Sequence, residues 1–231
     1  MSVNQGQILC LAKDFFRDHV AAKHLQNTIK LKDIEEFNIN PFTHKYLAQF
    51  AFGDSSPQSL AKAILYPRIM GTSISTTFGN QLQHFCSKVL PSMASLVPGI
   101  DIEFQDTVTG RKVYCQLKSG PTTINDGDVT TIRNHFKSMT NLARANQIAN
   151  FNPLTDCVVG VFYGDEASLS QAYKNLRKDY RVLVGRDFWE HLTGDKYFYD
   201  ALIEAFAEVA SEMDATDIVD ELVEELAQQL V

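Results

Sequence analysis

The sequence predicts an α/β fold, in which a mixed β-sheet is flanked by helices and the N-terminal half is helical. Three observations predict it. Apolar residues recur at helical intervals through residues 1–95. Two segments of alternating character, "IDIEFQDTV" and "RKVYCQLKS", follow as a predicted β-hairpin with "TG" between them. Two continuous apolar runs, "DCVVGVFYG" and "YRVLVG", then enclose a helical segment, as in a parallel βαβ unit.

The N-terminal part contains several helical segments separated by turns. "QGQILCLAKDFFRDHVAAKH" has a helical period, and "SPQSLAKAILYPR" begins with a Ser-Pro start signal, in which a first helical turn tolerates Pro57. "NPF" and "FGDSSP" are turn signals. "TSISTTFGNQLQHFCSKVL" is interpreted as a polar loop that runs into a helix.

The C-terminal part is also predicted to be helical. "RDFWEHLTG" ends at Gly194, and "YFYDALIEAFAEVASEM" follows. The final segment has one apolar stripe, formed by Ile218, Val219, Leu222, Val223, Leu226 and Leu230. Two interpretations of this stripe stay open: it packs on the domain's own core, or it forms a dimer contact. We expect a single domain, residues 1–231, with a mainly helical part (1–95), a sheet core (96–186) and acidic helices (187–231).

The net charge of −7 hides an asymmetry along the 231-residue chain. Residues 187–231 hold 13 acids and one lysine, Lys196, so their charge is −12 and the remainder carries +5. Residues 55–100 contain no acid at all. A basic body of this kind is suited to a polyanionic partner. The alternative is that the acidic end is only a solvated helix surface.

Several classes of protein are disfavoured. No apolar run is long enough to span a bilayer and the N-terminus lacks a signal pattern, so we expect a cytoplasmic protein with no membrane partner. The four cysteines are scattered, and the six histidines show no zinc-binding spacing. The motifs GxSxG, GxGxxG and GxxxxGK[ST] do not occur.

The hairpin brings polar side chains to one face. With a two-residue turn at Thr109 and Gly110, Asp101 lies opposite Lys118 and Glu103 lies opposite Gln116. These four side chains share a face because strand residues alternate. Ile100, Ile102, Phe104, Cys115 and Leu117 are expected on the other face.

Such a cluster suits phosphodiester hydrolysis. Asp101 can hold Mg²⁺, which prefers oxygen ligands and activates water, and Lys118 can stabilise the transition state. The alternative is a surface hairpin with a cross-strand ion pair, which contributes under about 1 kcal/mol.

"PGID" and "QLK" resemble the signature of the PD-(D/E)XK nuclease superfamily. The blocks "LYPRIMGTSISTTFGNQLQHF", "GIDIEF", "YCQLKSGPTTIN" and "FWEHLTGD" resemble type II restriction endonucleases, most nearly the group that cuts GGNCC-like sites. The resemblance covers about residues 35–205. It implies a restriction-endonuclease-like fold, Mg²⁺ as cofactor and double-stranded DNA as substrate.

The resemblance also implies roles for individual residues. Asp101 matches the metal-binding aspartate and Lys118 the motif lysine, while Leu117 would offer its carbonyl oxygen to the metal. Gln116 stands where the superfamily more often has an acid, so it would offer an amide oxygen without charge. Glu103 is a candidate to supply the missing charge, a second metal site or a contact to water.

Candidate DNA-binding residues lie in two segments. After Lys118, a helix starting near Val129 and capped by Asp128 would present Arg133 and Lys137 to phosphates. Asn125, in the segment before this helix, is a candidate for contact with a base edge. His135 in this helix is interpreted as a surface residue. In the acid-free segment, we expect a loop to carry three further candidates, Arg68, Thr72 and Ser73. Ordinary solvated positions are the alternative for both segments.

The sequence therefore predicts a Mg²⁺-dependent type II restriction endonuclease of the bacterial cytoplasm that cuts a palindromic site, possibly GGNCC-like. We expect a homodimer, because two-fold symmetry matches a palindrome. A cognate DNA methyltransferase would act on the same site without needing to bind the enzyme. The alternatives are a repair or mobile-element nuclease of the same fold and a non-catalytic DNA-binding protein.

Overall fold

The computed structural model describes residues 5–90 and 93–230 and divides into two compact units. The sheet unit contains the described parts of residues 5–13 and 82–205, and the helical unit contains residues 14–81 and 206–230. The candidate site lies in the sheet unit, and each unit is described separately below.

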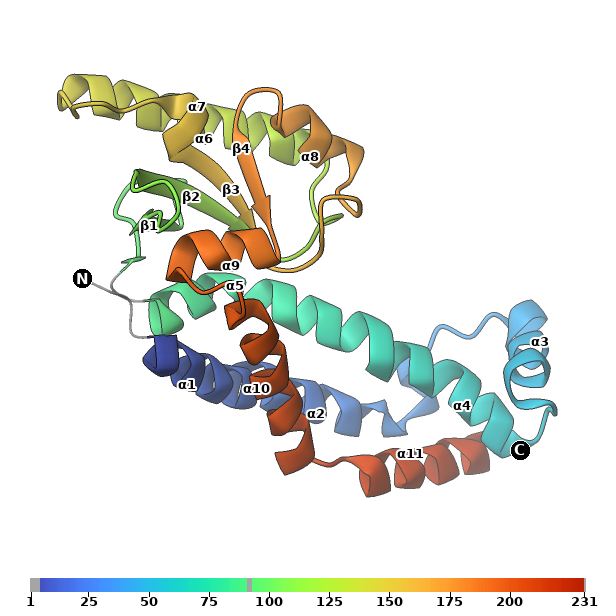
Figure 1. Ribbon diagram of the computed structural model, residues 1–231. Helices are drawn as coiled ribbons and strands as arrows, with labels where there is room; N and C mark the ends of the chain where they lie inside the picture. The colour runs from blue at the N-terminus through green and yellow to red at the C-terminus, as the bar shows by residue number, and fades with distance from the viewer. Residues whose placement is uncertain (1–4, 91–92, 231) are drawn as a thin grey trace. The chain divides into compact units, whose positions relative to one another are not determined.

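The sheet unit is built on a four-stranded mixed sheet (Figure 1). Its strands are β1 (Ile102–Gln105), β2 (Lys112–Lys118), β3 (Cys157–Val161) and β4 (Arg181–Val184), in that spatial order. β1 and β2 are antiparallel, and the other two pairs are parallel. The predicted hairpin, the βαβ unit and the α/β class are confirmed.

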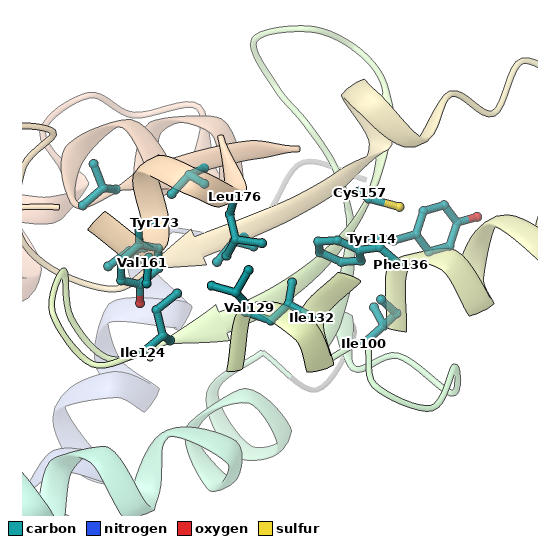
Figure 2. Close-up of a cluster of buried hydrophobic side chains, with 14 of the residues drawn as sticks. Ile100, Tyr114, Ile124, Val129, Ile132, Phe136, Cys157, Val161, Tyr173 and Leu176 are labelled. Carbon is teal, nitrogen blue, oxygen red and sulfur yellow. The ribbon is translucent and has the colours of Figure 1, made fainter. Parts of the chain in front are cut away.

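Two helices cover one face of this sheet, α6 (Asp126–Ala145) and α8 (Gln171–Leu176), and the short α7 (Pro153–Asp156) leads into β3. Figure 2 shows the buried cluster that they form with the strands. Alternate residues of the strands enter it, including Tyr114, Val159 and Val182. The register places Gln116 beside Val159 and Lys118 beside Val161, so the two polar side chains leave β2 on this same face.

The opposite face packs on α9 (Arg186–Thr193). Gly160 has no room for a side chain, because a Cβ there would lie 2.6 Å from the Phe188 ring and 2.9 Å from Cys115 Sγ. The Trp189 indole is fully buried and donates a 3.0 Å hydrogen bond to the Phe162 carbonyl. The helix ends at Gly194 with a φ of +80°, as predicted from the sequence.

The remaining helices lie wholly or partly in the helical unit. They are α1 (Gln5–Phe15), η1 (Phe16–Ala21), α2 (Ala22–Ile29), η2 (Lys30–Lys32), η3 (Ile34–Glu36), α3 (Pro41–Phe52), α4 (Pro57–Pro67), η4 (Arg68–Ser73), α5 (Ile74–Val89), α10 (Phe198–Glu212) and α11 (Thr216–Gln229). The division between the units falls inside α1, α5 and α10.

The prediction that a loop carries Arg68, Thr72 and Ser73 is wrong. These residues form the π-helix η4, which joins α4 to α5 without a break. Low helix propensity of Thr, Ser and Gly favours a loop locally. The wider π-helical turn nevertheless continues the helix beyond Pro67, so tertiary packing of the buried Ile69 outweighs propensity.

The apolar stripe of α11 packs within the helical unit. Leu222, Val223 and Leu226 of α11 are buried against Leu65 of α4 and Ile69 of η4. The interpretation that the stripe covers the chain's own core is confirmed. A role of the acidic helix in dimerisation stays a prediction.

The predicted register of the hairpin is wrong by two residues. Glu103 pairs with Tyr114 instead of Gln116. Beyond the strand ends, the Asp106 N–H donates to the Arg111 carbonyl, so four residues instead of two remain in the loop. Asp106 causes the longer loop: its Oδ1 accepts hydrogen bonds of 3.0 Å from the N–H groups of Val108 and Thr109. An even shift leaves every strand residue on its expected face, so the polar side chains of β2 still share the face predicted for them.

Two other expectations are corrected. Ile100 lies before β1 and packs in the α6 cluster, not with Ile102 on the other face, since the chain turns at Gly99 with a φ of +81°. Helix α6 begins at Asp126 and its N-cap is Asn125, whose Oδ1 accepts from Gly127 and Asp128. Asp128 completes a capping box from the third helical position and does not cap the helix itself.

Candidate active site

Asp101 is held at the start of β1 by β2. Its backbone N–H donates a 2.9 Å hydrogen bond to the Cys115 carbonyl, and its Oδ2 accepts a 2.7 Å hydrogen bond from the Leu117 N–H. Among the described residues, Oδ1 accepts no hydrogen bond. One carboxylate oxygen is therefore anchored to the strand while the other remains available to a ligand.

Burial raises the pKa of the Asp101 carboxyl above its ordinary value, against opposing effects of the Leu117 N–H, Lys118 and His135. A half-buried carboxylate loses hydration that would stabilise its charge. A cation bound at Oδ1 would restore that stabilisation. The electrostatics of Asp101 thus suit a residue that meets a positive ligand.

Gln116 is buried on the α6 face, with 5% of its surface exposed. Its Nε2 donates to the Gly99 carbonyl and lies 2.5 Å from Nδ1 of His135 on α6. Its Oε1 is buried and has no hydrogen-bond partner among the described residues. An unpartnered buried oxygen is uncommon in a folded protein and marks a place where a ligand can bind.

Lys118 ends β2 and is half-buried. Its carbonyl accepts a 2.8 Å hydrogen bond from the Phe162 N–H, which fixes the strand end. No ion pair or hydrogen bond of its ammonium group occurs within the described ranges, although its charge acts on Asp101. The ammonium group therefore lies near the carboxylate without being neutralised by it in a direct pair.

Glu103 is engaged elsewhere. Its Oε1 accepts a 2.7 Å hydrogen bond from Ser95, and its Oε2 forms a 2.7 Å ion pair with Lys112. Both oxygens thus have protein partners, whereas Asp101, Gln116 and Lys118 come together at the neighbouring strand ends. The predicted role of Glu103 in replacing the missing charge finds no geometric support.

The oxygen ligands at this strand end fit a hard cation. Asp101 offers a carboxylate oxygen, Gln116 an unpartnered amide oxygen and Leu117 a backbone carbonyl, the oxygen types that Mg²⁺ accepts while retaining several waters. In the part of the chain that the structure describes, no group of three or more His, Cys, Asp or Glu residues could hold a metal.

The α6 residues predicted to bind DNA differ in their surroundings. The Arg133 guanidinium forms hydrogen bonds of 2.9 and 2.6 Å with Asp179, so its charge is already paired. Lys137 is exposed and has no ion pair within the described segments. Asn125 is exposed, but its Oδ1 caps α6 and only its amide hydrogens remain free for a base.

Arg68, Thr72 and Ser73 line a polar groove of about 420 Å³ in the helical unit. Helix α2 and the start of η2 contribute Lys23, Asn27 and Lys30. The other side comes from η4 and α5, and the complete lining consists of Lys23, Asn27, Lys30, Leu31, Glu36, Arg68, Thr72, Ser73, Thr76, Thr77, Asn80 and Gln81. Three basic side chains face one acid, so the groove favours an anion.

The sequence analysis missed His135 and one wall of the groove. His135 lies at the edge of the buried stripe of α6 and reaches Gln116, although it was interpreted as a surface residue. Lys23, Asn27 and Lys30 share a helix face, and their spacing could have indicated the second wall of the groove. No sequence signal relates that wall to Arg68, because the two segments meet only in the tertiary structure.

The mixed sheet with flanking helices is a restriction-endonuclease-like α/β fold, a fold class of nucleases. A family model described as "Type II restriction endonuclease EcoO109I" matches residues 12–214. The chain belongs to this family, which makes it a restriction endonuclease, a hydrolase with DNA as substrate. No curated protein matches the chain. None of its described helices is long and apolar enough to cross a membrane.

Proposed function

We propose that the protein is a Mg²⁺-dependent enzyme of the PD-(D/E)XK type that cleaves both strands of DNA at one palindromic site. The observation that carries this proposal is the grouping of Asp101, the unpartnered Gln116 Oε1 and Lys118 at the ends of one antiparallel strand pair. It supplies two oxygen ligands and a cation around one position.

Asp101, Gln116 and the Leu117 carbonyl would hold the metal. When bound, Mg²⁺ neutralises charge on the scissile phosphate and makes water a better nucleophile at neutral pH. The Leu117 N–H keeps Asp101 oriented through the 2.7 Å hydrogen bond to Oδ2. Without this hydrogen bond, the carboxylate would rotate, and Oδ1 would no longer point toward the cation.

Lys118 would act on the attacking water and on the transition state. Its ammonium group can orient the water and stabilise negative charge that develops on the phosphate oxygens. The water oxygen would form a bond to phosphorus and release a proton to solvent, the bond between phosphorus and the leaving sugar oxygen would break, and that oxygen would take a proton from solvent. The half-buried position strengthens these electrostatic effects, because water screens them less.

Two surfaces would hold the duplex. The groove with Lys23, Lys30 and Arg68 would neutralise backbone phosphates, and Lys137 on α6 would add a contact in the sheet unit. Asn125, Thr72 and Ser73 would contribute polar contacts. A homodimer would place two such sites on a palindrome, and similarity in four sequence blocks supports a GGNCC-like recognition site.

The test is cleavage of unmethylated plasmid DNA of known sequence in Mg²⁺ or in EDTA, with Lys118→Ala as the matched variant. We expect discrete fragments that require Mg²⁺ and disappear in the variant. Fragments that map to one palindrome would establish the recognition site. A smear would instead indicate a repair-type nuclease, and DNA retardation without cleavage would indicate a binding protein.

A further inference from the structure

We propose that His135 is a positioning residue: by accepting a hydrogen bond from Gln116 Nε2, it turns Gln116 Oε1 toward the cation held by Asp101. This inference rests on the proposed function, and it assigns to α6 a part in building the metal site.

The Gln116 amide nitrogen has two acceptors around it, the Gly99 carbonyl and His135 Nδ1 at 2.5 Å. An amide nitrogen carries two hydrogens, which match these two acceptors. The reversed amide would set its oxygen against the Gly99 carbonyl, which can only accept, and against His135 Nδ1 in the tautomer that carries its hydrogen on Nε2. The network therefore selects one of the two amide orientations. When Nδ1 accepts, the imidazole hydrogen is on Nε2.

This selection determines where the oxygen points. Oε1 is directed away from Gly99 and His135, and it is buried without a partner in the described residues. Leaving a buried oxygen unpaired is unfavourable, because the oxygen has lost its hydrogen bonds to water. A cation at Oε1 would remove that cost. Because glutamine brings no charge to the metal, correct orientation before binding is its main contribution to affinity.

The fold brings His135 into place from α6. Ile132 and Phe136 are buried in the sheet cluster, and His135 lies between them in sequence at the half-buried edge of that stripe. Gly99 allows the close approach, since a Cβ there would lie 2.6 Å from His135 Nδ1. The glycine, the histidine and the glutamine thus form one packed arrangement beside Asp101.

The experiment measures binding of Mn²⁺ alone, by electron paramagnetic resonance and without DNA, to the full-length wild type and three variants. His135→Ala removes the acceptor and is expected to weaken Mn²⁺ binding by about tenfold. His135→Asn can return an oxygen near the position of Nδ1 and is expected to recover most of the affinity. Asn134→Ala, at an exposed neighbouring position of α6, is expected to bind as the wild type does.

A second readout does not depend on metal. The side-chain NH₂ signals of Gln116 in the metal-free protein should shift in His135→Ala and return toward their wild-type positions in His135→Asn. With Mg²⁺ and DNA, His135→Ala should raise the Mg²⁺ concentration for half-maximal cleavage more than it lowers the rate at saturation.

Equal Mn²⁺ affinity in wild type and His135→Ala would overturn the inference, and so would a His135→Asn variant as weak as His135→Ala. Both results leave the proposed function intact if the wild type binds Mn²⁺ and cleaves DNA. A wild type that binds no Mn²⁺ and does not cleave would instead remove the proposed metal site, and with it this role of His135.

Discussion

The Leu117 N–H donates a 2.7 Å hydrogen bond to Asp101 Oδ2, so strand β2 orients a carboxylate whose charge is disfavoured by burial. Asp101→Asn keeps an acceptor for this hydrogen bond and removes the charge. A raised folded-state pKa means that Asp101 stabilises the fold only at low pH, and this contribution is lost as pH rises through the folded-state value.

We therefore expect Asp101→Asn to be more stable than the wild type at pH 7 without Mg²⁺. A gain of roughly 1 kcal/mol would raise Tm by about 2–4 °C in a chain of this size. The same variant should not cleave DNA. Calorimetry at pH 7 measures the predicted rise in Tm. An unchanged or lower Tm would contradict the inference that the buried charge of Asp101 destabilises the fold.

Asp106 is the main polar support of the hairpin end. Its side chain is fully buried, with its Oδ1 2.7 Å from His191 Nδ1 and its Oδ2 3.2 Å from Arg181. Asp106→Ala would remove a buried acceptor from the Arg181 guanidinium, the His191 imidazole and two loop N–H groups, so we expect a loss of about 3 kcal/mol in the free energy of unfolding. Urea denaturation measures it. Glu166→Ala, at an exposed ion pair with Arg177, serves as control and should change stability little.

The same carboxylate predicts a pH dependence. Although burial alone raises the pKa of Asp106, hydrogen bonds from Thr109 and His191 bring it below the ordinary value of 3.8. A lowered folded-state pKa gives stability that is present above 3.8 and is lost as pH falls through the folded-state value. As pH falls below 3.8 and through the folded-state pKa of Asp106, the difference in stability between wild type and Asp106→Ala should shrink. A constant difference from pH 7 to pH 2 would contradict this assignment.

Gly99→Ala tests the approach of α6 to the site. The new methyl group would meet the His135 ring, and alanine at a φ of +81° is strained. We expect a loss of about 1–3 kcal/mol in the free energy of unfolding. Gly110→Ala, at a φ of +68° with open space around it, isolates the backbone contribution as a control. Similar losses in the two variants would show that the His135 contact adds nothing.

The groove predicts a salt-dependent effect on DNA binding. Lys30→Ala and Arg68→Ala should each weaken binding similarly for all sequences and reduce the slope of log K against log salt by about one. Fluorescence anisotropy in the Lys118→Ala background, which we expect not to cut DNA, gives this slope. If the double variants gave the same slope as Lys118→Ala alone, phosphate contacts of Lys30 and Arg68 in the groove would be excluded.

On α6, Lys137→Ala should weaken DNA binding more than Arg133→Ala does. Asp179 already pairs with Arg133 at 2.6 Å, whereas Lys137 keeps its charge available to a phosphate. The same anisotropy titration compares the two variants. A larger effect of Arg133→Ala would show that the Asp179 pair opens when DNA binds.

Local patterns were sufficient for much of the fold. The alternation in "IDIEF" and "KVYCQLK" identified the hairpin and the shared face of Gln116 and Lys118, because strand side chains alternate whatever the loop length. Continuous apolar runs identified β3 and β4. Gly194 identified the end of α9, since a left-handed C-cap favours glycine.

Other features were decided by contacts between distant residues. The register depended on how Asp106 hydrogen-bonds its loop, and the helical state of Arg68–Ser73 depended on packing that outweighs low propensity.

The sequence by itself determined the fold class, the strands and the site residues to be tested. Only the tertiary structure decided that His135 meets Gln116, that Asp179 pairs with Arg133, and that Lys23 faces the same groove as Arg68. The physical reason is that periodicity reports the direction of a side chain within its own element. The partner it meets there depends on how separate elements pack.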